Sequence, residues 1–179
     1  MINLSVLFKR TFFIIVVLFC GRSLAATVYF DSQKFIEIAS VRSISELETA
    51  KIALQKSNSP LVRAYAQSMI TESAATLVSL RKLANDSHLY IYSDAELQTK
   101  ARKYIFERKG KTFDTAYADM RAAECRKMVT LFREAVGSDE VLFKHYAETE
   151  LPSLMHHLYM AQQLVEHVDS ASTMLASQL

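Results

Sequence analysis

Ionisable side chains interrupt the apolar faces of the long helices that the sequence predicts. Carboxylates, imidazoles and thiolates that converge from facing helices are the groups that bind metal ions in the cores of helical proteins. The predicted helix of residues 138–173 shows the pattern best, because Glu150 and His157 lie in an otherwise apolar stripe of spacing three and four. The candidate metal ligands are Glu46, Glu124, Cys125, Glu150 and His157.

The chemistry open to this set is narrow. None of the five histidines has an acidic residue three positions before it, so the Glu-x-x-His pairs of di-iron proteins are absent. A set that contains a thiolate would favour zinc or copper. The alternative, which we favour, is a polar core without a cofactor in which Glu46 and His157 satisfy one another by a hydrogen bond or ion pair.

The elements that must position these residues are helices. Apolar residues recur every three or four positions over about 31–56, 61–86, 112–136 and 138–173, with residues 174–179 as a tail expected to fray. Ser59 before Pro60 is a strong helix start, and Ser93 with Glu96 forms a capping box that opens a short helix closed by Gly110. Ser138 is expected to cap the last helix, with acidic residues in its first turn.

These elements predict an all-α protein. With only 3 Gly and 2 Pro in 179 residues, few long elements with short connections are favoured over many short strands. Four long helices, with one longer crossover that carries a short extra helix between the second and third long helices, indicate a ferritin-like four-helix bundle. We expect residues 26–179 to form this single domain.

Residues 1–25 have the order of a secretory signal peptide. Lys9 and Arg10 precede an apolar run, and Ser23 to Ala25 form a small-x-small cleavage site. We therefore expect cleavage after Ala25 and a periplasmic location. A retained membrane anchor and a lipid attached to Cys20 are the alternatives.

Charge and cysteine content limit the partners. Lys9, Arg10 and Arg22 leave with the leader, so the mature chain keeps 18 basic residues against 19 acidic ones, without a basic patch for nucleic acid. No helix is basic on one face and aromatic on the other, so we expect no membrane contact after cleavage. Cys125 is then the only cysteine, either buried or able to link a homodimer.

Four segments resemble a family of exported bacterial proteins grouped as domain of unknown function 4142: residues 45–53, 62–72, 112–117 and 151–158. The resemblance implies a ferritin-like four-helix fold, an Asp-His pair in the second and fourth helices, and one histidine after a Leu-Pro in the last. At these places the chain has Glu72–Ser73, Glu124–Cys125 and His157, with Glu46 as the carboxylate of the first helix. Both paired histidines are therefore replaced.

The sequence favours a non-enzymatic, exported protein that acts through interactions. No nucleophile–base pair and no Gly-rich phosphate loop is visible, so we expect no catalytic residues. The partner would be an envelope protein, and the role would be in envelope stress or as a periplasmic inhibitor or immunity partner. An inhibitor or immunity partner would need a groove or an exposed apolar patch. The second hypothesis is a degenerate ferritin-like metal or redox protein that uses Glu46, Cys125 and His157.

Overall fold

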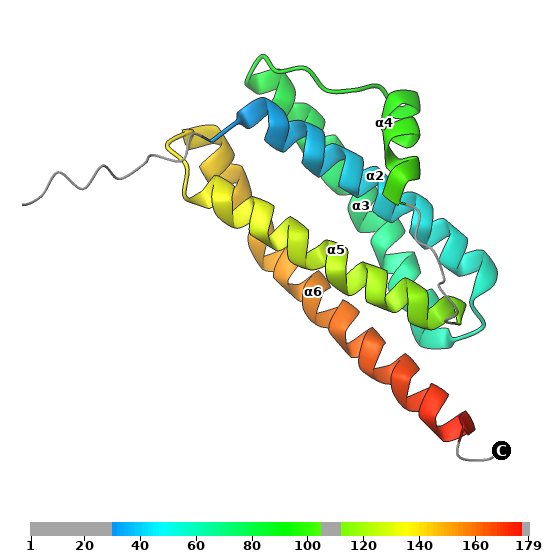
Figure 1. Ribbon diagram of the computed structural model, residues 1–179. Coiled ribbons are helices and arrows are strands. Elements are labelled where there is room, and N and C mark those ends of the chain that lie inside the picture. The colour runs from blue at the N-terminus through cyan, green and yellow to red at the C-terminus, as the bar shows by residue number, and fades with distance from the viewer. Residues whose placement is uncertain (1–29, 105–111, 177–179) are drawn as a thin grey trace, which may run out of the picture.

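The computed structural model describes residues 30–104 and 112–176, and within them the regular structure is entirely helical. Four long helices lie side by side, and a short helix covers one of them (Figure 1). The long helices are α2 (Ser32–Lys56), α3 (Pro60–Asp86), α5 (Phe113–Val136) and α6 (Val141–Ala176). The short α4 (Asp94–Ala101) continues into the 3-10 turn η1 (Arg102–Tyr104) and packs on α2.

The helices start where local signals place them. The side chains of Asp31 and Ser59 cap α2 and α3 by accepting a hydrogen bond from the backbone N–H of the third residue of each helix, and Pro60 occupies the first turn of α3. The Ser93–Glu96 capping box at α4 is present in both directions, and Thr112 caps α5. These starts confirm the prediction.

Three predicted helix ends differ from the structure. The α4 helix gives way to a 3-10 turn after Ala101, and Gly110, expected to close it, lies outside the described residues. The α6 helix starts at Val141 with no acidic residue in its first turn, because Glu140 stands at the capping position, where its carbonyl accepts from the N–H of Lys144. The helix also continues to Ala176, so the frayed tail predicted from residue 174 is wrong up to that point.

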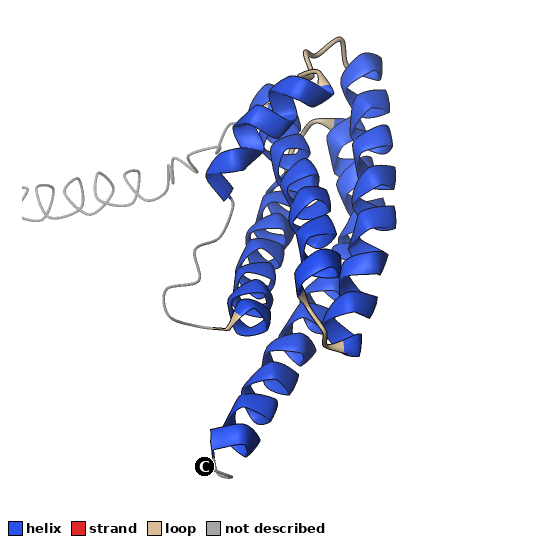
Figure 2. Cartoon of the chain, turned by 90° about the vertical axis from the view of Figure 1, so that its right-hand side faces the viewer, coloured by secondary structure: helices blue, strands red, loops and turns tan. Residues whose placement is uncertain are grey.

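The four long helices are arranged so that every neighbour is antiparallel. The α2 helix contacts α3 and α5, and α6 contacts α5 and α3. Short turns reverse the chain between α2 and α3 and between α5 and α6, whereas the connection from α3 to α5 passes through α4 along the outside of α2 (Figures 1 and 2). The α2–α5 side and the α3–α6 side are therefore opposite faces of the molecule.

Apolar residues fill the space between the four long helices in two stacked clusters, and a third, smaller cluster lies where α4 packs on the bundle. One end is aromatic, with the ring of Phe35 5.0 Å from that of Phe132 and 5.6 Å from that of Phe143. The other end is built from smaller side chains around Met69 and Tyr117. The last part of α6 leaves this core after Val168, its last buried residue, and residues 169–174 are exposed.

Among the described residues, no helix is both long enough and apolar enough to cross a bilayer.

Candidate functional site

The inward carboxylates of α2 and α5 are paired with arginines. Glu46 of α2 bonds to Arg121 of α5, and Glu124 of α5 bonds to Arg42 of α2. Each helix contributes one acid and one base, four positions apart on α2 and three apart on α5. Because the two helices are antiparallel, the acid of each helix meets the base of the other. A third base, Lys127, lies 2.7 Å from Glu124.

Arg121 is the most deeply buried charge of this seam. It is only 2% exposed and lies in the cluster of smaller side chains with Tyr65, Tyr117 and Cys125. Burial alone would lower the pKa of its guanidinium, but the facing Glu46 carboxylate holds that pKa well above its ordinary value. Arg121 therefore stays charged, and Glu46 supplies the compensating charge.

The thiol of Cys125 lies in the same cluster, 3.8 Å from the hydroxyl of Tyr65. Burial and the nearby Glu46 carboxylate raise the pKa of this thiol, although Arg121 opposes the shift. Burial also raises the pKa of the hydroxyls of Tyr65 and Tyr117. A thiol that stays protonated at neutral pH is a poor nucleophile and a poor metal ligand. Its predicted burial is confirmed, with 4% exposure.

His157 lies on the opposite side of the molecule, between α6 and α3. Its ring nitrogen Nε2 bonds to the carboxylate of Glu72, and the hydroxyl of Ser153 lies 3.3 Å from the same nitrogen. A Ser-His-acid relay needs the acid and the serine on different ring nitrogens. Because both groups meet Nε2 here, this cluster has the composition of a catalytic triad without its geometry.

The two carboxylates near His157 respond to burial in opposite ways. Burial would raise the pKa of Glu72, but hydrogen bonds from Ser68 and His157 outweigh it and hold that pKa below its usual value. Burial raises the pKa of Glu150, and His157 opposes the shift only in part. His157 thus bonds to the ionised form of Glu72, whereas it acts on Glu150 only through its charge.

The predicted inward positions are mostly confirmed, but one predicted pair is wrong. Ser73, Cys125 and His157 are buried, as their helical stripes indicate. We expected Glu46 and His157 to satisfy one another; instead Glu46 bonds to Arg121 and His157 bonds to Glu72.

The sequence interpretation missed Arg42, Arg121 and Glu72 as members of these clusters. A signal for two of them was present. Arg42 precedes Glu46 by four positions and Arg121 precedes Glu124 by three, which puts a base and an acid on one face of each helix.

The candidate ligands do not fit a metal ion. Within residues 30–104 and 112–176, no three His, Cys, Asp or Glu side chains lie close enough together to hold one. Glu46 and Glu124 each face a guanidinium, which repels a second cation, and His157 lies in a separate cluster with Glu72. Binding of zinc or copper by these residues stays a prediction that this donor geometry does not favour.

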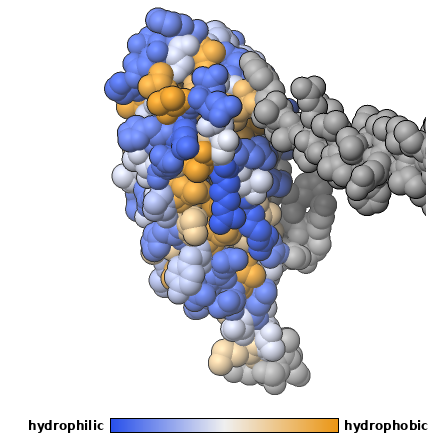
Figure 3. Space-filling model, turned by 90° about the vertical axis from the view of Figure 1, so that its left-hand side faces the viewer, coloured by the Kyte–Doolittle hydropathy of each residue, from blue (hydrophilic) through white to orange (hydrophobic). Residues whose placement is uncertain are grey.

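An apolar groove of about 380 Å³ opens between α3 and α6. Its walls come from a short stretch of each helix: Leu61, Ala64, Tyr65 and Ser68 on α3, and Tyr159, Met160, Gln163 and Leu164 on α6. Large apolar side chains at its rim face solvent, with Leu61 43% and Tyr159 58% exposed. Figure 3 shows the side of the molecule on which α6 lies, where hydrophobic side chains form an interrupted stripe between hydrophilic ones.

Comparison with known proteins adds the family. The search of curated proteins and the search of solved structures each found no match. A family model described as a domain of unknown function, DUF4142, matches residues 22–164, which is most of the chain and includes α2 to α5 and α6 as far as the groove. The chain therefore belongs to the DUF4142 family.

Proposed function

We propose that this protein is a non-enzymatic, exported helical protein of the periplasm that acts by binding an envelope protein through the face formed by α3 and α6. This protein would use that face in a response to envelope stress, or to inhibit the protein that it binds. The signal-like order of residues 1–25 supports the location.

We also propose that the fold is a ferritin-like four-helix bundle. Two antiparallel pairs, α2 with α3 and α5 with α6, are joined by one long connection. This is the connectivity that distinguishes ferritin-like bundles from those in which all connections are short.

The groove between α3 and α6 is the observation that carries the proposal. Folding leaves Leu61, Met155 and Tyr159 between 43% and 58% exposed on neighbouring helices, although each could contribute to a core. Aromatic and methionine side chains are enriched at the centres of protein interfaces, and contiguous exposed apolar surface marks binding sites on soluble proteins. A groove about 380 Å³ in volume adds the concave shape that an anchoring side chain needs.

The polar clusters support binding rather than catalysis as the role of the molecule. Glu46 and Glu124 are neutralised by arginines of the same chain. The Cys125 thiol is buried with a raised pKa, and Ser153 and Glu72 compete for one nitrogen of His157. A homodimer through Cys125 would require the helices to separate, because this thiol is 4% exposed.

Photo-crosslinking in living cells tests the proposal. A benzoylphenylalanine placed at Leu61 or at Tyr159, each on its own, reports what lies against either wall of the groove. Val141 and Leu142, which are 77% and 53% exposed at the other end of α6, are matched control positions. We expect both groove positions to give an adduct of the same mass that neither control gives. Adducts that are equally strong at all four positions, or absent from both groove positions, would contradict the proposal.

A further inference from the structure

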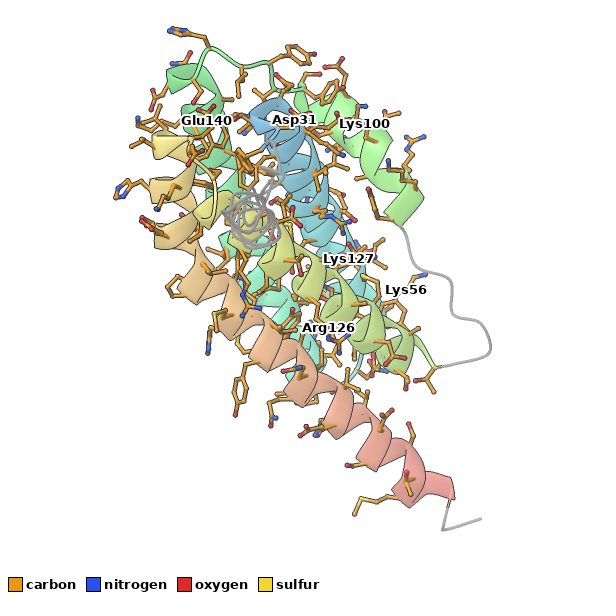
Figure 4. All side chains as sticks on the ribbon, turned by 60° about the vertical axis from the view of Figure 1, so that its left-hand side comes forward. Asp31, Lys56, Lys100, Arg126, Lys127 and Glu140 are labelled. Atoms are coloured by element: carbon orange, nitrogen blue, oxygen red, sulfur yellow. The ribbon has the colours of Figure 1, made fainter. Side chains whose placement is uncertain are left out.

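Charge is balanced differently on the two faces of the molecule. On the α2–α5 side and on α4, carboxylates are paired with lysines and arginines of the same chain. The pairs are Glu37–Lys100, Glu46–Arg121, Glu48–Lys51 and Glu124–Arg42. Figure 4 shows Lys56, Lys100, Arg126 and Lys127 on α2, α4 and α5, so basic side chains gather on this side too.

The α6 helix is acidic, and its acids are not compensated. Between Val141 and Ala176 it carries Lys144 as its only lysine or arginine, against Glu148, Glu150, Glu166 and Asp169. Among the described residues, none of these four carboxylates forms a salt bridge with a lysine or arginine. The α6 helix therefore offers negative charge to a partner, whereas on the opposite side four carboxylates are paired within the chain.

Two carboxylates border the apolar groove. The hydroxyl of Ser68, in the α3 wall, donates to Glu72 at 2.7 Å, and the side-chain amide of Gln163, in the α6 wall, donates to Glu166 at 3.2 Å. Among the described residues, Glu72 is bonded to His157 but to no lysine or arginine, and Glu166 has no basic partner.

Arg63, next to the wall residue Ala64, is turned away from this groove. Arg63 follows Leu61 on α3, but its guanidinium donates to the backbone carbonyls of Leu54 and Ser57. These carbonyls belong to the end of α2 and the turn that follows it, where a cation is favourable. Among the described residues, no lysine or arginine therefore pairs with Glu72 or Glu166 beside the groove.

We propose that the groove between α3 and α6 binds a cationic amphipathic helix of a partner protein; this inference rests on the proposed function. The walls follow two neighbouring helices, and on α3 they run from Leu61 to Ser68, roughly 10 Å or two turns of helix. A partner helix would place apolar residues of spacing three and four into the groove and its lysines or arginines near Glu72 and Glu166. A second copy of this chain fits less well, because it would bring two acidic α6 helices together.

Synthetic helices test this inference. The probe is a labelled peptide of about 14 residues, four turns, with leucines on one face and lysines on the other. One control peptide replaces every lysine by glutamate, and another keeps the composition but scrambles the order. We expect the first peptide to bind the mature protein at least about tenfold more tightly than either control, with an affinity that falls as salt is added.

Variants of the protein locate the binding site. Tyr159→Ser removes an exposed anchor, and Glu166→Lys reverses the charge at the groove. Each should weaken binding of the lysine peptide about tenfold or more. Val141→Ser, on the same helix and 77% exposed, should leave the affinity unchanged.

Three results would overturn the inference. Equal binding of the glutamate peptide would remove the role of charge, and an unchanged affinity in Tyr159→Ser would place the binding site elsewhere. A dimer detected by light scattering and lost in Tyr159→Ser would make a second copy the occupant. If groove crosslinks form in cells while the lysine peptide does not bind, the proposed function stands and this inference fails.

Discussion

Among single substitutions in the ion pairs between α2 and α5, we expect Arg121→Met to lower the free energy of unfolding most. The side chain of Arg121 is 3% exposed and that of its partner Glu46 is 13% exposed, so the variant leaves a carboxylate largely shielded from water without its cation. Removing one partner of a buried ion pair costs about 3–5 kcal/mol of unfolding free energy. That cost is a large part of the 5–15 kcal/mol by which a domain is usually stable.

The double variant Arg121→Met/Glu46→Leu separates the unpaired charge from lost packing. Replacing both partners of a buried pair by apolar residues is often neutral or stabilising, so the double variant should be more stable than Arg121→Met. Urea unfolding of the mature chain, followed by circular dichroism, measures both. Lys51→Met is the control, because its pair with Glu48 is half exposed and should cost less than about 1 kcal/mol. A loss below about 1 kcal/mol in Arg121→Met, or additive losses in the double variant, would refute the reasoning.

Three further predictions concern the other titratable groups. Burial raises the folded-state pKa of Glu150 above 4.5, so its carboxylate destabilises the fold at neutral pH; Glu150→Gln should raise the urea midpoint there, and the gain should vanish below pH 4.5. The pKa of Glu72 is lowered, so Glu72→Gln should cost about 0.2–1 kcal/mol at neutral pH and nothing once the pH falls below the folded-state pKa. Cys125 should not react with a thiol reagent until urea unfolds the protein, and a fast reaction in the native state would contradict its burial.

Most of the helical layout could be predicted from the sequence because its signals are local. Ser59 with Pro60, and Ser93 with Glu96, act within one turn of the helices that they start. The end of α6 was missed for the same reason. Its exposed final turns contain no terminating glycine or proline, and neither the apolar period nor a local stop signal marks Ala176 as the place where the helix ends.

The partners of the inward residues could not be predicted in the same way. Apolar periodicity tells which side of a helix Glu46 or His157 faces, but not how far the facing helix is shifted along its axis. That shift decides whether Glu46 meets Arg121 or another residue, and it follows from packing over the whole length of α2 and α5. The groove between α3 and α6 could not be predicted from the sequence either, because its shape depends on how closely these two helices, which are far apart in the chain, approach one another.

The metal content of the mature protein tests most directly whether arginines, rather than a metal ion, balance the carboxylates between α2 and α5. The protein would be offered zinc, copper and iron in turn, dialysed without a chelator, and measured by plasma mass spectrometry beside the Cys125→Ser variant. We expect far less than one equivalent of any metal per chain, and no difference between the two proteins. One equivalent of zinc or copper that disappears in Cys125→Ser would contradict the account.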